Sequence, residues 1–298
     1  MSASIIKFNG GLGNQIFQYA FYLYCESNGI SVEADKTVYY TKHIHGGYLL
    51  DSLFPTNKIC YTTIDTTRYN KPFSLQEKTL NRLFHHVNYH YFEEYFKAVT
   101  DVIPFLKKEE FCYLEGWWQD IEYTKVSTEK LKKTKCSLIN NPNFTTNATL
   151  EIILNSESVS LHIRRGDYLQ SRTAKARYGN ICTEEYYKHA IEYFKAHYSK
   201  AKFFVFSDDI EYCKSLFAGE DYFFVEPSVP ELAYVDMLLM SECKHHIIAN
   251  SSFSWWGAML SAHAGTIIMP DSWDNVSGNN RLHIPGSLRL NNRGVFID

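Results

Sequence analysis

The sequence lacks any long apolar run. The best candidate, residues 16–25, contains Gln18 and is about half the roughly 20 residues that a membrane-spanning helix needs. The N-terminus, Met1 to Lys7, also lacks the basic segment followed by an apolar one that marks a secretory signal peptide. We therefore expect a soluble cytoplasmic protein, and the sequence leaves open a peripheral association with the inner membrane.

An excess of positive charge is missing too. The chain of 298 residues carries 30 Lys and Arg against 33 Asp and Glu, which gives a formal net charge of −3. Dedicated nucleic-acid binders usually present a basic surface, so we expect no nucleic-acid partner. Aromatic residues are plentiful at 16%, which suits contacts with sugar rings as well as an ordinary core.

Paired cysteines are absent from the sequence. The number of cysteines is odd and no two of them form a CxxC pair, which indicates a reducing compartment and argues against a disulfide framework or a thiolate zinc site. The seven are Cys25, Cys60, Cys112, Cys136, Cys182, Cys213 and Cys243.

Familiar nucleotide and metal motifs are incomplete. The glycine turn at 10–13 is not the dinucleotide fingerprint, whose third glycine would fall at Gln15 or later, and no Gly-Lys-Ser/Thr follows as in a P-loop. Asp208 and Asp209 are adjacent rather than alternating, and Asp209 stands where a helix N-cap belongs. We therefore expect capping and a hydrogen bond to a ligand here, and no metal site.

What the sequence does contain is a regular alternation of strands and helices. It opens with a strand at 4–8, a helix at 14–26 and a strand at 31–35, and after a further strand at 111–115 and a helix at 127–135 the rhythm becomes strict. This alternation predicts α/β domains with parallel sheets covered by helices on both faces. The later strands are expected at 159–163, 202–206, 222–225, 246–249 and 266–269, with helices at 183–198, 209–217, 230–243 and 252–263 between or after them, and another helix is expected at 75–86.

Two Rossmann-like domains facing each other across a cleft are the natural architecture for this pattern. The polar segment 140–147 is the most linker-like stretch. We place an N-terminal domain at 1–150 and a C-terminal domain at 151–298.

The densest chemistry is His-Ile-Arg-Arg-Gly-Asp-Tyr at 162–168, directly after a strand. Each Arg is always charged and its planar fork of donors suits two phosphate oxygens. Because open α/β sheets bind ligands at the carboxyl ends of their strands, Arg164 and Arg165 predict a phosphate site, with His162 and Asp167 beside it. The alternative is a pair of surface arginines in ion pairs.

Other strand ends carry polar groups of the same kind. Gly11 and Gly13 follow the first strand and expose helix N-terminal amides, while Ser251 and Ser252 place hydroxyls before a helix. Asp236 is a lone acid on a largely apolar helix; it is either a surface residue or, if buried, a partner for the N–H edge of guanine.

Taken together, five segments resemble the bacterial α-1,2-fucosyltransferases of glycosyltransferase family 11. They cover the chain from end to end in the order of the family. They are Gly-Gly-Leu-Gly-Asn-Gln-Ile-Phe-Gln-Tyr-Ala at 10–20, Leu-Glu-Gly-Trp-Trp-Gln at 114–119, His-Ile-Arg-Arg-Gly-Asp-Tyr at 162–168, Phe-Ser-Asp-Asp at 206–209 and Asn-Ser-Ser-Phe-Ser-Trp-Trp-Gly at 250–257.

The resemblance implies a GT-B fold, GDP-fucose as donor and inverting transfer to the 2-hydroxyl of a terminal β-galactoside, with no cofactor and no required metal. It implies that Arg164 and Asn14 are catalytic, with Arg164 neutralising the departing phosphate. The donor site would comprise Gly11, Gly13, His162, Arg164, Arg165, Ser207, Asp208, Asp236, Ser251, Ser252 and Phe253. The acceptor would meet Trp117, Trp118 and Gln119, in the region that also holds His43.

Some assignments stay open at this point. Asp167 is a candidate general base, but it could instead serve Arg165. The rivals are a GDP-fucose-dependent transferase of another linkage in surface polysaccharide synthesis, a non-catalytic glycan or nucleotide-sugar-binding module, and a nucleotide-dependent oxidoreductase. The oxidoreductase has the wrong glycine pattern and only Asp35 as a ribose-binding acid. The oligomeric state and the physiological acceptor cannot be read from the sequence.

Overall fold

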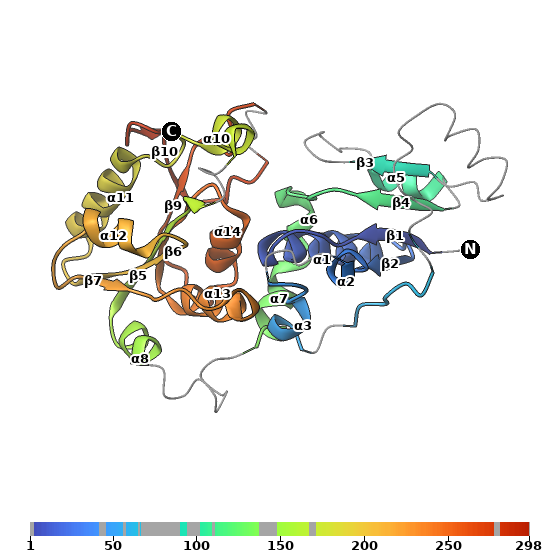
Figure 1. Ribbon diagram of the computed structural model, residues 1–298, viewed down its shortest axis with the longest axis horizontal. Coiled ribbons are helices and arrows are strands. Elements are labelled where there is room, and N and C mark those ends of the chain that lie inside the picture. Colours follow the sequence, from blue (N-terminus) through green and yellow to red (C-terminus); the bar gives the residue numbers. More distant parts are fainter. Residues whose placement is uncertain are drawn as a thin grey trace.

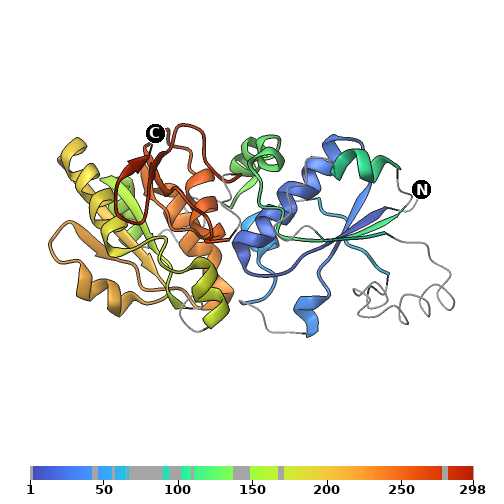
Figure 2. The same cartoon turned by 90° about the horizontal axis from the view of Figure 1, so that it is seen from above.

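The computed structural model consists of two α/β domains side by side (Figures 1 and 2). It describes residues 3–41, 46–55, 58–64, 66, 90–93, 102–108, 111–136, 148–166, 171–276 and 281–297. Within these ranges, no helix has the length and apolar character required to cross a membrane.

The N-terminal domain is built on a four-stranded sheet in the order β2-β1-β4-β3, and its paired strands are all parallel. Its strands are β1 (Ser4–Lys7), β2 (Val32–Asp35), β3 (His90–Glu93) and β4 (Cys112–Glu115). Its helices are α1 (Leu12–Ser27), α2 (Val38–Thr41), α3 (Leu50–Leu53), α5 (Val102–Lys108), α6 (Ile121–Lys125) and α7 (Thr128–Thr134).

The C-terminal domain is built on a seven-stranded sheet in the order β11-β10-β9-β8-β5-β6-β7, parallel except for the last pair, β10 and β11. Its strands are β5 (Glu157–Ile163), β6 (Ala201–Ser207), β7 (Tyr222–Phe224), β8 (His245–Ile247), β9 (Ile267–Pro270), β10 (Leu288–Leu290) and β11 (Phe296–Ile297). Its helices are α8 (Ala148–Leu154), α10 (Arg172–Tyr178), α11 (Glu184–His197), α12 (Ile210–Leu216), α13 (Ala233–Glu242) and α14 (Ser252–Met259), with a 3₁₀ turn at Pro230–Leu232.

One large hydrophobic cluster extends across both domains. Helix α1 is buried along most of its length because one side covers the N-terminal sheet and the other packs on α14. At that contact the ring of Phe17 lies 4.8 Å from Trp255 and 5.1 Å from Trp256, centroid to centroid. A continuous cluster of buried side chains therefore runs from one domain into the other and fixes their relative position.

The fold agrees with the expected class, and parallel sheets in two domains across a cleft form the GT-B arrangement. The expected boundary at 150/151 falls inside α8, whose contacts with β5 and α13 place this helix in the C-terminal domain. The expected helix at 75–86 and the linker-like segment 140–147 lie outside the described residues.

Candidate active site

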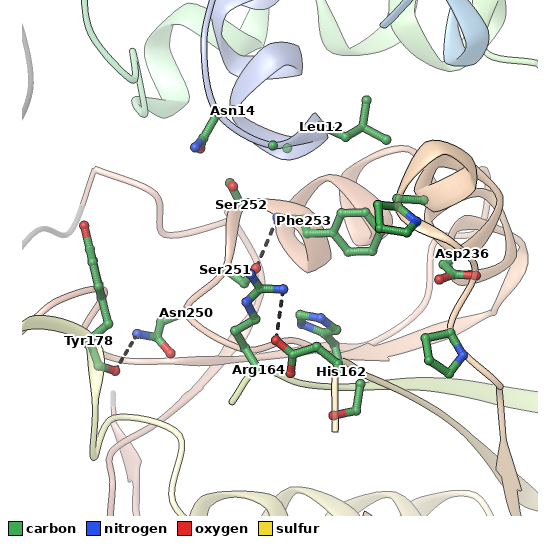
Figure 3. Close-up of a pocket in the computed structure, with 18 of the residues that line it drawn as sticks. Leu12, Asn14, His162, Arg164, Tyr178, Asp236, Asn250, Ser251, Ser252 and Phe253 are labelled. Atoms are coloured by element: carbon green, nitrogen blue, oxygen red, sulfur yellow. Dashed lines mark hydrogen bonds and ion pairs between the residues drawn. The ribbon is translucent and has the colours of Figure 1, made fainter. Parts of the chain in front are cut away.

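A cavity of about 510 Å³ lies between the domains, at the carboxyl ends of strands from both sheets. A cavity of this volume can hold a ligand as large as a nucleotide. Figure 3 shows its labelled residues from both domains, with Asn14 and Leu12 facing Ser252 and Phe253. Its lining includes Gly10, Gly11, Leu12, Gly13, Asn14, Trp117, Gln119, His162, Arg164, Tyr178, Ser207, Asp208, Ser228, Asp236, Asn250, Ser251, Ser252, Phe253 and Trp273.

Two helix N-termini from different domains meet at this cavity. Gly11 is the N-cap of α1 and offers no side-chain cap, whereas the Ser251 hydroxyl caps α14 by accepting from Phe253 N–H at 3.3 Å. The helices come so close that a Cβ on Gly13 would lie 2.5 Å from the carbonyl carbon of Ser252. Because both termini carry partial positive charge, their meeting is unfavourable unless an anion lies between them.

Arg164 supplies a full positive charge beside these helix ends. It follows β5, lines the cavity, and its Nη1 lies 3.2 Å from Oδ2 of Asp208. Asp208, at the end of β6, also accepts from the backbone N–H of Arg165 and of Gly166, both at 3.0 Å. The carboxylate therefore fixes the turn that presents Arg164 to the cavity.

Arg165 was expected to contact the phosphates of the donor together with Arg164, but its side chain points away from the cavity. Its Nε donates to Asp209 at 3.1 Å and its guanidinium lies 3.3 Å from the ring centre of Tyr212, outside the cavity. Asp209 is the N-cap of α12, as predicted, and accepts from Tyr212 N–H. Successive residues after a strand face opposite ways, so only the first of the two guanidiniums reaches the cavity.

His162 lies in the cavity wall on β5 and is almost fully buried. Burial, assisted by the charge of Arg164 and opposed by Asp208, lowers its pKa to about 3, so the imidazole is neutral at physiological pH. Its Nδ1 has no hydrogen-bond partner among the described residues, and its ring lies 5.9 Å from that of Phe253. A neutral imidazole can donate to a ligand oxygen without adding charge.

The cavity has two chemically different ends, and Figure 3 shows Arg164 between them. At one end Asp236 accepts from the backbone N–H and the hydroxyl of Ser228, at 3.1 and 2.7 Å, and burial raises its pKa. At the other end the Asn250 amide donates to the carbonyls of Tyr178 and Trp273, at 3.1 and 3.2 Å. Asp236 is thus a half-buried acceptor in the wall and not a surface residue.

The segment after β4 divides its side chains between cavity and core. Trp117 and Gln119 line the cavity, but Trp118 is fully buried and stacks on Phe21 with ring centroids 3.8 Å apart. The expected contact of Trp118 with the acceptor is therefore not what this structure shows, because the indole is part of the core.

Some site residues were not predicted, and others cannot be placed. Asp167 and His43 lie outside the described residues. Tyr178, at the end of α10, was missed because no strand precedes it directly, and Ser228 and Trp273 were missed because they follow their strands by several residues and belong to no recognised motif. Among the described residues, no grouping of three or more His, Cys, Asp and Glu side chains could hold a metal.

The model of the family described as Glycosyl transferase family 11 matches residues 3–281 of the chain. The chain belongs to this family. Its family 11 relatives include an Escherichia coli protein named alpha-1,2-colitosyltransferase, 36% identical over 92% of this chain and 93% of the relative. The E. coli O-antigen biosynthesis glycosyltransferase WbnK is 32% identical over 92% of this chain and 95% of its own length. The human galactoside alpha-(1,2)-fucosyltransferase 1 is 28% identical over 38% of this chain and 33% of its own length.

The family 11 assignment makes the chain a glycosyltransferase and removes the oxidoreductase reading. The site agrees with it, because helix N-termini from both domains and the guanidinium of Arg164 border one cavity. The donor sugar and the linkage are finer questions and are argued next.

Proposed function

We propose that this enzyme transfers L-fucose from GDP-fucose to the 2-hydroxyl of a terminal β-galactoside, with inversion and without a metal. The observation that carries this proposal is the convergence of three positive groups: the N-terminus of α1, the N-terminus of α14 and the guanidinium of Arg164. A diphosphate is the part of a nucleotide sugar that matches them.

The chemistry explains why such a site can dispense with a metal. As the glycosidic bond of the donor breaks, negative charge develops on the β-phosphate while the sugar becomes oxocarbenium-like. Pre-aligned cationic donors stabilise that charge without reorganising during the reaction. Arg164 holds its position through Asp208, and the helix ends are fixed by the core, so all three groups are in place before the ligand binds.

The two ends of the cavity suggest how the donor lies. The Asp236 carboxylate has two oxygens, and the Watson–Crick edge of guanine offers two parallel N–H donors. We therefore place guanine at that end, the diphosphate at Arg164, and the fucose toward Asn14 and Tyr178. Trp117 also lines the cavity, and it is the residue that we place against the incoming acceptor.

A second donor is favoured by one specific finding. The relative that is 36% identical is named for colitose, which is the 3-deoxy counterpart of L-fucose. GDP-colitose would satisfy the same diphosphate and guanine contacts and differ only by the loss of one hydroxyl. The acceptor for either donor would be a β-galactoside end of a surface polysaccharide, in keeping with the O-antigen relative.

One assay separates these alternatives. The enzyme is incubated with lactose and either GDP-fucose or GDP-colitose, with and without EDTA, and GDP release and the NMR spectrum of the product are recorded. The proposal expects fucosylation at the 2-hydroxyl with inverted anomeric configuration, undiminished by EDTA. Faster turnover of GDP-colitose would select the second donor, and GDP-fucose binding without turnover would indicate a binding module.

A further inference from the structure

Gln119 occupies an unusual place, because it joins the two domains at the edge of the cavity. Its Nε2 donates to Oδ1 of Asn14 on α1 at 2.9 Å, and its Oε1 accepts from Nε1 of Trp273 in the C-terminal domain at 3.2 Å. Trp273 is nearly buried, and its carbonyl is held by Asn250. All four side chains line the same cavity.

The donor and acceptor roles along this series of hydrogen bonds are fixed by Trp273. An indole N–H can only donate, so the Gln119 atom that faces Trp273 must be the oxygen. The amide nitrogen of Gln119 then faces Asn14, whose oxygen must accept. This leaves the Nδ2 group of Asn14, with its N–H donors, as the part of the amide that can bind a ligand in the cavity.

We propose that Gln119 is a positioning residue: anchored by Trp273, it fixes the amide of Asn14 so that N–H donors, and not a carbonyl oxygen, face the bound donor substrate. This inference rests on the proposed function, because a diphosphate or a sugar hydroxyl supplies the oxygen that Asn14 binds. We call the hydrogen bonds from Trp273 through Gln119 to Asn14 the relay. Without the relay, the amide of Asn14 could rotate by 180° and present an acceptor to an anionic ligand.

The backbone next to Gln119 supports a role beyond packing. Trp118 has a φ of 54°, a left-handed conformation that is unfavourable for a residue other than glycine. This turn directs the indole of Trp118 into the core and lets Trp117 and Gln119, on either side of it, line the cavity. A strained backbone conformation persists only where the surrounding structure enforces it, and such conformations cluster at functional sites.

The first test uses Gln119→Glu, which has the same shape. When ionised, the new side chain can accept from Trp273 but cannot donate to Asn14, so the Asn14 amide turns its oxygen toward the cavity. When protonated, it regains one O–H donor. Relative to wild type at the same pH, we expect kcat to fall about 10²-fold at pH 8 and the deficit to shrink to less than about 10-fold at pH 5, where about one side chain in six is protonated at an ordinary glutamic-acid pKa of about 4.3.

Asn155→Asp is the matched control, because it adds a negative charge at an exposed site near the opposite end of β5, away from the cavity. It should stay within about twofold of wild type at both pH values, since charges so far from the ligand are screened. A Gln119→Glu deficit that does not change with pH would overturn the relay.

A second test avoids the charge altogether. If Gln119 acts only through Asn14, then Gln119→Leu lowers kcat in the wild-type background but has no further effect in an Asn14→Ala background. Losses that multiply would overturn the proposal. Wild-type turnover of GDP-fucose, measured first, keeps the two questions apart: its absence rejects the proposed function, whereas an active wild type with an equally active Gln119→Leu variant rejects the relay alone.

Discussion

Gly13 on α1 and Ser252 on α14 come from different domains, yet their backbones are in direct contact. A methyl group on Gly13 would lie 2.5 Å from the carbonyl carbon of Ser252 and 2.6 Å from the amide nitrogen of Phe253. Glycine is therefore required here by the close approach of the helices and not by its own backbone angles. This contact brings two helix N-termini to one point, where we propose that the diphosphate binds.

Gly13→Ala should separate the helices, because neither neighbour is a flexible side chain. We expect a loss of about 1–3 kcal/mol in the free energy of unfolding, as for other overpacked sites, and a GDP affinity reduced at least about 10-fold. Urea unfolding and calorimetric GDP titration measure the two effects. Gly29→Ala is the control: its φ is +75° and nothing lies within 4 Å of the added methyl, so it should cost stability without changing GDP affinity.

Arg164 and Arg165 are neighbours in sequence but should behave differently when each is replaced by alanine. Arg164→Ala removes the cavity cation, and we expect kcat to fall on the order of 10²–10³-fold while the circular dichroism spectrum stays unchanged. Arg165→Ala removes an ion pair with Asp209 and a stacking contact with Tyr212, so it should lower the melting temperature and reduce kcat less than about 10-fold. Equal losses of kcat in the two variants would contradict the assignment of one arginine to the ligand.

Asp236 should determine the preference for guanine. Inosine diphosphate lacks the 2-amino group of GDP, so the wild type should bind it more weakly, because one carboxylate oxygen loses its hydrogen bond to the base and keeps only that to Ser228. Asp236→Asn should weaken GDP binding about 10-fold and abolish the discrimination between the two nucleotides, with little change in kcat at saturation. Asp221→Asn, an exposed position paired with Lys195, controls for the loss of a negative charge. Retained discrimination in Asp236→Asn would remove guanine from this end of the cavity.

Buried histidines should make the fold sensitive to acid. Burial lowers the pKa of His246 to about 3, and its Nδ1 lies 2.8 Å from the Ser160 hydroxyl. Because this folded pKa lies below the unfolded value of about 6.5, the unfolded chain takes up a proton that the folded chain does not, and stability falls as the pH drops from about 6.5 toward 3.

Each buried histidine of this kind adds up to about 1.4 kcal/mol per pH unit to the fall in unfolding free energy as the pH decreases. His246→Asn keeps a hydrogen-bonding group for Ser160 and removes the titrating group, so its unfolding free energy should fall less steeply than that of the wild type between pH 5.5 and 4.5. Urea titrations at several pH values measure the slopes, and identical slopes would show that His246 is already protonated in the folded protein.

The sequence predicted the elements whose patterns are set locally. The strand at Glu157–Ile163 alternates the apolar Val159, Leu161 and Ile163 with polar residues, and helix α11 follows a capping Thr183. Apolar spacing and caps act within a few residues, so both could be read directly. The antiparallel strand Phe296–Ile297 was not predicted, because two residues carry no periodicity and are held only by their partner strand.

The site was predictable to the same limited degree. Strand ends predicted that Arg164, Ser207 and Ser251 lie close together, and all three line one cavity, because topology alone brings the carboxyl ends of parallel strands together. The directions of Arg165 and Trp118 could not be read, since they depend on Tyr212 and Phe21, which approach only in the folded chain. The sequence identifies which segments meet, whereas tertiary packing decides which side chain of each segment faces the ligand.

The most direct test of the central claim is a crystal structure of the enzyme soaked with GDP-fucose. We predict that oxygens of the diphosphate lie within about 3 Å of the Arg164 guanidinium and of backbone N–H groups at the start of α1 or α14. Phosphorus atoms bound elsewhere, away from Arg164 and from the Gly13–Ser252 contact, would contradict the account.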